Sequence, residues 1–370
     1  MSHPSRRLLS MCLGVLAVVV ILTGAAMATA GPLRGGSRSW RPEPAGVPWG
    51  AFLGSGAEGV RDMTRMQQWL GGTELRVGHT YLPGNHWTDI EGDRGLLGAW
   101  ARWRNADPDR LFVLNVPMLD RNEARVPDRE VAGLLERGAQ GEFDEHYRTL
   151  AARLVELGLA DTVIVPGWEM NGTTYTGRCA PNPEAWKAYW MGIVMVMRSV
   201  PGQRFRFDFA PSRGEDAIGW THCYPGDDVV DIIGMDSYDQ PPGNDFDEHV
   251  DQPFGLRAHV EFAEAHGKPV SYPEWGLFRN GDNPEYMRRM LKWIADHPPE
   301  YHTITDYCPH GVWRCGKNPR ASRVFRSVQF TGVLGPEQGA RADCLQLGPV
   351  PWLSPFVGRR RLCVRFWQDS

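Results

Sequence analysis

The sequence predicts a single (β/α)8 barrel over residues 47–330 of the 370-residue chain. Short apolar runs rich in β-branched residues alternate eight times with segments whose apolar residues recur at helical spacing. A span of this length is typical of the fold. An open doubly wound sheet is the alternative, and it is disfavoured because no G-x-G-x-x-G turn follows any run and no G-x-x-x-x-G-K-[ST] loop is present.

Composition is that of a globular protein. Hydrophobic residues make up 42% and charged residues 23% of the chain, so it can bury a sizeable core. The formal net charge is −4, so the chain lacks the excess of basic residues that is typical of nucleic-acid-binding proteins, and we expect no nucleic-acid partner. We expect the protein to be a monomer.

Eight short runs are predicted to form the barrel strands. Each combines apolar and β-branched residues over a length that suits a strand rather than a helix. In chain order the runs are 47–54, 74–82, 110–119, a fourth that starts at Asp161, 204–212, 229–238, 268–276 and 301–307.

Helices are predicted between these runs. Asn182 followed by Pro183 is a helix start signal, and Gly267 is a stop signal. A long helical region over 130–159 is expected to break near residues 138–141, where two glycines stand. The other predicted helices are 58–71, 95–106, 183–200, 254–267, 284–297 and a last one from Pro319 to Val328.

The N-terminal segment is predicted to be a signal peptide rather than part of the barrel. Arg6 and Arg7 precede an apolar stretch, which ends in an A-x-A site at residues 28–30. The alternative is an uncleaved membrane anchor, because residues 8–28 are long enough to span a bilayer. In either case we expect the body of the protein to be secreted or associated with the cell envelope, with any membrane contact made only through this segment. Residues 31–46 are predicted to be a linker and residues 331–370 an irregular C-terminal tail.

Six cysteines follow the predicted signal peptide, an even number that suits disulfides in an exported chain. Cys308 and Cys315 are seven residues apart and can close a small loop, and Cys179 can pair with Cys223 if their loops are neighbours. The sequence has no pair of C-x-x-C motifs, which disfavours zinc, and neither H-E-x-x-H nor an EF-hand loop is present. We therefore expect no metal and no cofactor.

Barrel enzymes place their active sites at the carboxyl ends of the strands, so polar residues there are candidates for function. They are His79, Tyr81, Asn115, Trp168, Glu169, Asn171, Asp208, Ser212, Asp236, Tyr238, Glu274, Trp275 and Asp306.

Two glutamates are the most informative of these residues. Glu169 and Glu274 end the otherwise apolar fourth and seventh runs, where a carboxylate is unfavourable unless it is paired or faces a cleft. Strands four and seven lie nearly opposite each other across a barrel mouth, so the two carboxylates can face each other. Two carboxyls about 5 to 5.5 Å apart suit a retaining glycosidase, in which one is the nucleophile and the other the acid/base. A structural salt bridge or a surface acid is the alternative for either glutamate taken alone.

At these residues the sequence resembles glycoside hydrolase family 26, a family of β-mannanases in the large clan of retaining barrel enzymes. The resemblance is carried by WEMNGTTYTG at 168–177, GMDSYD at 234–239 and PEWG at 273–276. It implies Glu169 as the acid/base, Glu274 as the nucleophile and Tyr238 as a hydroxyl that orients the nucleophile. The family usually carries a histidine immediately before the acid/base, where this chain has Trp168.

Further residues are candidates for substrate binding, in addition to Tyr238. Tryptophans near the site can stack on pyranose rings, although a buried aromatic is more often part of the core. Histidine, asparagine and aspartate side chains near the site can bind sugar hydroxyls, or can be structural hydrogen-bonding groups. The candidates are Trp168, Trp275, Trp313, His79, Asn171 and Asp236.

Taken together, the sequence predicts a secreted retaining endo-β-glycosidase that hydrolyses a polysaccharide, with mannan as the substrate that the resemblance implies. Two alternatives stay open. One is a non-catalytic carbohydrate-binding barrel protein. The other is an endo-glycosidase of the same clan that acts on xylan, glucan or an envelope glycan.

Overall fold

The computed structural model describes residues 46–331, 345–346 and 361–362. The predicted signal peptide, nearly all of the predicted linker, and the C-terminal tail apart from a two-stranded ribbon and Thr331 lie outside the described residues. The ribbon pairs β10 (Leu345–Gln346) with β11 (Arg361–Leu362) in antiparallel fashion. None of the helices in the described part of the chain is long and apolar enough to cross a bilayer.

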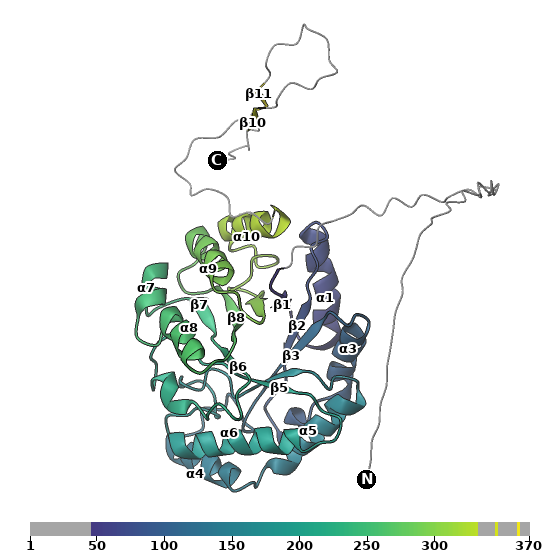
Figure 1. The fold of residues 1–370 in the computed structure, drawn as a ribbon, viewed down its shortest axis with the longest axis vertical. Coiled ribbons are helices and arrows are strands. Elements are labelled where there is room, and N and C mark those ends of the chain that lie inside the picture. Colours follow the sequence, from purple (N-terminus) through teal and green to yellow (C-terminus); the bar gives the residue numbers. More distant parts are fainter. Residues whose placement is uncertain (1–45, 332–344, 347–360, 363–370) are drawn as a thin grey trace, which may run out of the picture. The chain divides into compact units, whose positions relative to one another are not determined.

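The predicted (β/α)8 barrel is confirmed (Figure 1). Its strand pairs are all parallel, and the sheet closes because β1 pairs with β2 on one side and with the last strand, β9, on the other. Parallel strands need crossover connections, which the outer helices supply. The strands are β1 (Trp49–Phe52), β2 (Val77–Tyr81), β3 (Leu111–Val116), β4 (Val163–Pro166), β5 (Arg206–Phe209), β6 (Ile232–Gly234), β7 (Ser237–Asp239), β8 (Val270–Leu277) and β9 (His302–Thr305).

The sixth barrel strand differs from the prediction of one continuous run over 229–238. It is divided into β6 and β7, which both pair with β8. Between them, Asp236 leaves the ladder to bridge Ser212, and its backbone N–H donates to the carbonyl of Pro211. The break therefore ties the sixth strand to the loop that follows β5, at the end of the barrel where Tyr238 lies.

Helices form the outer layer around the strands (Figure 1). The predicted break in the long helical region is confirmed, because α4 ends at Ala139 and α5 begins at Asp144, with Gly141 between them at a φ of +84°. Asn182 starts α6 by accepting a hydrogen bond from the backbone of Ala185. The helices are α1 (Gly56–Trp69), α2 (Trp87–Ile90), α3 (Arg94–Asn105), α4 (Asp128–Ala139), α5 (Asp144–Glu156), α6 (Pro183–Arg198), α7 (Phe246–Asp251), α8 (Leu256–Ala265), α9 (Pro284–Asp296) and α10 (Pro319–Thr331), with a 3-10 turn η1 (Trp220–Cys223). The short elements α2, α7 and η1 are additions to the predicted set.

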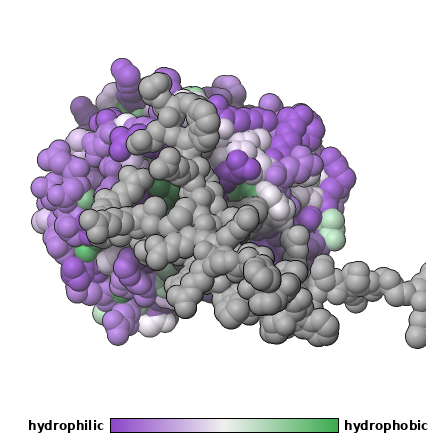
Figure 2. Space-filling view, turned by 90° about the horizontal axis from the view of Figure 1, so that it is seen from above, coloured by the Kyte–Doolittle hydropathy of each residue, from purple (hydrophilic) through white to green (hydrophobic). Residues whose placement is uncertain are grey.

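The main hydrophobic core lies between the strands and the surrounding helices, whereas the barrel interior is partly polar. Inside the barrel, Asp208 accepts hydrogen bonds from Ser271 and Tyr301, and the three side chains are buried. The coloured surface in Figure 2 is mostly hydrophilic. A second buried apolar cluster, which includes Val77, Val113 and Val163 of β2, β3 and β4, packs beside these polar groups, so the barrel is stabilised by apolar contacts on both sides of its strands.

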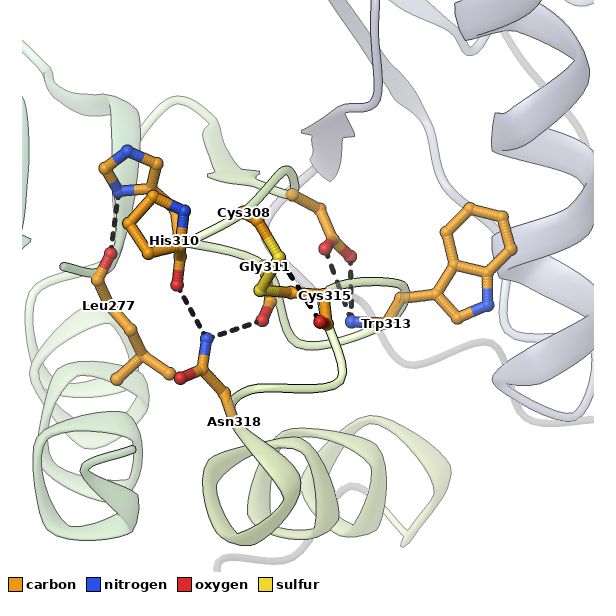
Figure 3. The surroundings of a disulfide bond; sticks show 9 residues. Leu277, Cys308, His310, Gly311, Trp313, Cys315 and Asn318 are labelled. Carbon is orange, nitrogen blue, oxygen red and sulfur yellow. Dashed lines mark hydrogen bonds between the residues drawn. A yellow bond between two sulfur atoms is a disulfide. The ribbon is translucent and has the colours of Figure 1, made fainter. Parts of the chain in front are cut away.

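Both expected cysteine pairs are disulfide-bonded in the structure, Cys179 with Cys223 and Cys308 with Cys315. The first joins the loops after β4 and β5. The second closes a small loop after β9 (Figure 3). Cys344 and Cys363 lie outside the described residues.

Candidate active site

A cleft with two halves lies at the carboxyl ends of the strands. The halves enclose about 490 and 500 Å³, and they share Tyr175, Glu274 and Tyr307 in their walls. The aromatic half is lined by Phe52, Ser55, Tyr81, Leu82, Pro83, Gly84, Asn85, Asn122, Glu123 and Trp168 in addition to the shared residues. The charged half includes Glu169, Ser212, Arg213, Glu215, Asp216, Tyr238, Gln240, Arg279 and His310. Glu274 therefore stands at the junction of the two halves.

Glu274 is positioned by β8 and held by hydrogen-bond donors. Asn115 donates its amide N–H to Oε1 at 3.1 Å, and the Tyr238 hydroxyl donates to Oε2 at 2.7 Å. Burial, followed by the negative charge of Glu169, raises the pKa of Glu274 from 4.5 to about 7, while hydrogen bonds from Tyr81, Tyr238 and Asn115 act to lower it. These donors offset part of the penalty that burial places on the carboxylate of Glu274.

Glu169 lies in the turn after β4, not within the strand. Its φ of +51° is in the left-handed region, which is unfavourable for a residue with a Cβ. The turn is fixed because the backbone N–H of Glu169 donates to the carbonyl of Ala210 at 2.8 Å. The Ser212 hydroxyl donates to Oε1 of Glu169 at 2.7 Å. Burial raises the pKa of Glu169, and the nearby Asp216 carboxylate raises it further.

The hydrogen bonds distinguish the two glutamates chemically. Both pKa values are raised, so the pair favours a state with one proton and one charge. Glu274 accepts from several donors, which stabilise a carboxylate, whereas Glu169 accepts from the Ser212 hydroxyl alone among the side chains. The hydrogen-bond donors thus favour the charge on Glu274, whereas burial and the nearby Glu169 act against it.

The structure places Trp168 and Tyr238 in the cleft walls, as expected for residues that contact a ligand. The other five predicted substrate-binding residues, His79, Asn171, Asp236, Trp275 and Trp313, do not line either half. The prediction that Trp275 stacks on substrate is wrong. Its side chain is fully buried, and its indole N–H donates to His302 on the outer side of the strands. Trp313 packs partly buried against the hydrophobic core, with Arg314 over its ring.

Two of these five residues support the site from behind. His79 is fully buried, and its Nε2 lies 2.9 Å from the Asn115 oxygen, so it orients the amide that donates to Glu274. Asn171 is also fully buried, and its side chain bonds the backbone of Ser212 and Gly214. Asn171 thereby fixes the loop whose Ser212 hydroxyl reaches Glu169.

Asp236 lies close to both glutamates without lining the cleft. It is 2% exposed, and among the described residues neither carboxylate oxygen has a hydrogen-bond partner. Burial, and then the charges of Glu274 and Glu169, raise the pKa of Asp236 well above its usual range. A neutral carboxylic acid is therefore the favoured form at this position.

Several residues of the cleft wall were not in the predicted site. Tyr175 follows β4 by nine residues, and Asn122 lies in the loop after β3, where no strand periodicity marks a position. Tyr307 is the second residue after β9 and is 50% exposed. Its neighbour Cys308 begins the disulfide-closed loop, which His310 fixes to the carbonyl of Leu277 (Figure 3). The end of the eighth predicted strand was the one signal that could have identified Tyr307.

Among the described residues, no group of three or more histidine, cysteine, aspartate or glutamate side chains is arranged to hold a metal ion.

Comparison with known protein families gives a match to glycosyl hydrolase family 26 over residues 162–277. The matched segment begins beside β4 and ends with β8, so it contains both glutamates, Ser212 and Tyr238. A comparison with curated protein sequences gives no significant match.

Solved structures with the same fold include three mannanases. The mannanase of Bacillus subtilis is 17% identical, with 74% of this chain and 83% of that chain covered and a TM-score of 0.56. A modular endo-β-1,4-mannanase from Cellulomonas fimi is 19% identical over 77% and 71%, with a TM-score of 0.57. The GH26 β-mannanase of Bacteroides ovatus is 19% identical over 79% and 90%, with a TM-score of 0.55. These likenesses show the shared fold, and the match over residues 162–277 confirms the resemblance of this part of the chain to glycosyl hydrolase family 26.

Proposed function

We propose that the protein is an exported endo-acting β-glycosidase of the retaining type, with mannan as its substrate. The observation that carries the proposal is that Glu169 and Glu274, from opposite sides of the barrel, line one cleft with different hydrogen-bond environments. Two carboxyl groups in opposite protonation states are what double displacement at a glycosidic bond requires.

The reaction takes place in two steps. In the first, Glu274 attacks the anomeric carbon while Glu169 donates its proton to the departing glycosidic oxygen, and a glycosyl ester forms on Glu274. In the second, Glu169 removes a proton from water, which attacks the same carbon and releases Glu274. The Tyr238 hydroxyl, 2.7 Å from Oε2 of Glu274, holds the carboxylate in position for attack.

The shape of the cleft supports endo action. Glu274 stands where the aromatic and charged halves meet, so a polymer can occupy both sides of the bond that is cleaved. An exo-acting enzyme needs a cleft that is closed on one side of the reacting sugar. The two halves thus suit cleavage within a chain.

Mannan is proposed from the match to family 26 and from the mannanases that share the fold. Trp168 stands where the family usually has histidine, so the sugar beside the cleaved bond is the part of the specificity to test. Export is proposed from the predicted N-terminal signal, and it suits the two disulfides, which persist in oxidising compartments.

The test is release of reducing ends from mannan, galactomannan, xylan and mixed-linkage glucan, with the anomeric form of the first product followed by NMR. We expect release from mannans, first as the β-anomer. Glu274→Ala and Glu169→Ala should each lower kcat by roughly 10⁴-fold or more, with circular dichroism unchanged.

Glu264→Ala is the matched control, because Glu264 is an exposed glutamate on α8 that lines neither half of the cleft. Turnover retained in Glu274→Ala would disprove the catalytic assignment. Release from xylan or glucan alone would keep the mechanism and change the substrate. Binding of these glycans without any release would favour a non-catalytic barrel.

A further inference from the structure

One polar side chain in the aromatic half of the cleft is almost completely buried and lacks a hydrogen-bond partner. Asn122 is 7% exposed and belongs to the wall of this half. Within the described part of the chain, its side-chain amide makes no hydrogen bond, although buried polar groups nearly always do. Neither the nitrogen nor the oxygen of this amide is a fully buried atom without a partner, so the amide is in contact with the space outside the protein. The amide is therefore open to the cleft.

The backbone of Asn122 is held firmly, which fixes the place of this amide. Its N–H donates to the carbonyl of Gly84 at 2.9 Å, and its carbonyl accepts from the N–H of Thr176 at 2.7 Å. A Cβ added to Gly84 would lie 2.7 Å from the Cβ of Asn122, so the two loops touch. Three loops of the barrel mouth thus preorganise one free amide, as a recognition group requires.

Aromatic rings stand in the same half of the cleft. Trp168 contacts Tyr81 at a centroid distance of 5.4 Å and Tyr175 at 4.9 Å, and all three residues line the aromatic half. Ligand sites commonly combine apolar walls with a few placed polar groups that set orientation. A pyranose ring offers both a C–H face for the rings and hydroxyls for an amide.

The charges in this half are of one sign. Glu123 and Glu274 are its charged residues, and no lysine, arginine or histidine lines it. The charged half, by contrast, includes Arg213 and Arg279. A sugar that carries a carboxylate would meet two like charges in the aromatic half without a cation to offset them.

We propose that Asn122 recognises the hydroxyl groups of an uncharged pyranose unit in the aromatic half of the cleft, and that this half rejects acidic sugars. The amide N–H donates to one hydroxyl, and the amide oxygen accepts from its neighbour. This inference rests on the proposed function and names the class of sugar at one side of the cleavage point.

The test is calorimetric binding in a Glu169→Gln background, which stops turnover and leaves every residue of the aromatic half unchanged. The probes are β-1,4-linked mannohexaose, cellohexaose and xylohexaose, and a β-1,4-linked mannuronate hexamer. We expect Asn122→Ala to weaken binding of the neutral hexamer that binds tightest by about tenfold or more, since a paired polar contact is lost. Asn122→Asp, which keeps the shape and loses the donor, should weaken it at least as much.

Two controls separate recognition from structure. Asn122→Ala should unfold at the same temperature as its parent, because the side chain makes no bond within the folded protein. Asn244→Ala changes an exposed asparagine outside the cleft wall and should leave binding unchanged.

An unchanged dissociation constant in Asn122→Ala would overturn the inference. So would a mannuronate hexamer that binds as tightly as the neutral ones, or a failure of every neutral hexamer to bind. The proposed function fails separately, when the wild-type protein releases no reducing ends from any polysaccharide. If the wild-type enzyme cleaves a polysaccharide and Asn122→Ala, made without the Glu169 change, has the same KM, the proposed function stands and the inference about Asn122 is disproved.

Discussion

Glu274 combines a reactive position with an unfavourable environment. It is 6% exposed and shares the cleft with Glu169, so its charged form lacks water and meets a like charge whenever Glu169 is also ionised. The donors Asn115 and Tyr238 offset only part of this penalty, because its pKa remains raised, at about 7. The charged form of Glu274 therefore destabilises the folded protein above neutral pH.

This charge predicts a pH-dependent gain in stability for Glu274→Gln. An acid whose pKa rises on folding destabilises the protein as the pH rises from its unfolded value of about 4.5 to its folded value of about 7. The variant should match the wild type below pH 4.5 and exceed it above pH 7, by up to about 3 kcal/mol. The measurement is urea unfolding of both proteins from pH 4 to 8.

Glu123→Gln is the control for this experiment, because Glu123 is an exposed carboxylate of the same cleft. It should not reproduce the gain of Glu274→Gln, because it removes no buried charge. A Glu274→Gln variant that is less stable than the wild type at pH 8 would contradict the expectation.

The expectation that functional residues lie at the carboxyl ends of the strands identified the two glutamates but not all of their neighbours, and the reason is geometric. Glu274 and Trp275 are adjacent in β8, and neighbouring side chains of a strand point to opposite faces. Glu274 therefore faces the cleft while Trp275 packs in the outer layer, on its contact with His302. Asn122 and Tyr175 lie in loops, where no periodicity specifies a direction, so the sequence alone could not place them.

Among the helices, the contact of α4 with α6 depends on a glycine. A Cβ at Gly138 would lie 2.6 to 2.7 Å from ring atoms of Tyr189. Tyr189 is fully buried and donates its hydroxyl to the carbonyl of Met118 at 2.6 Å, so its ring has little freedom to move. The helix can approach this closely only without a side chain there.

Gly138→Ala should therefore destabilise the protein by about 1 to 3 kcal/mol, the usual range for overpacking in a core. Gly133 offers a matched control in the same helix, since a Cβ there would meet nothing within 4 Å. Gly133→Ala should be neutral or stabilising by up to about 1 kcal/mol, because alanine favours helix. Thermal and urea unfolding of the two variants would check both signs, and equal effects would refute the packing argument.

The order of strands and helices followed from hydrophobic periodicity, and the exception was the sixth strand. Its run, VVDIIGMDSY, has no proline and is nearly continuous in apolar character. The break arises from tertiary contacts, since Asp236 pairs with the loop after β5 instead of continuing the ladder. Local sequence carries no signal for such a change of partner.

The barrel closes through its own first and last strands. β1 pairs with β9 from Trp49 with His302 to Phe52 with Thr305. After β9, helix α10 returns Phe325 to the ring of Trp49 at a centroid distance of 5.9 Å. The fold is thus completed by residues within 46–331.

A chain restricted to residues 46–331 should therefore fold and act as the full chain does. We expect one cooperative unfolding transition within about 2 °C of the full-length protein, and the same kcat/KM on the preferred glycan. Scanning calorimetry and the reducing-end assay check the two parts. A fragment that unfolds in a broad or much lower transition would show that the boundaries predicted from the sequence are wrong.

The pairing of β1 with β9 also has a consequence for engineering. Since the first and last strands are neighbours, a short peptide can join residue 331 to residue 46, and new termini can be opened at the exposed turn around Gly202, before β5. Such a circular permutant would keep every strand pair while it reverses the order in which Glu169 and Glu274 leave the ribosome. The cleft would then be assembled from the same parts along a different biosynthetic path.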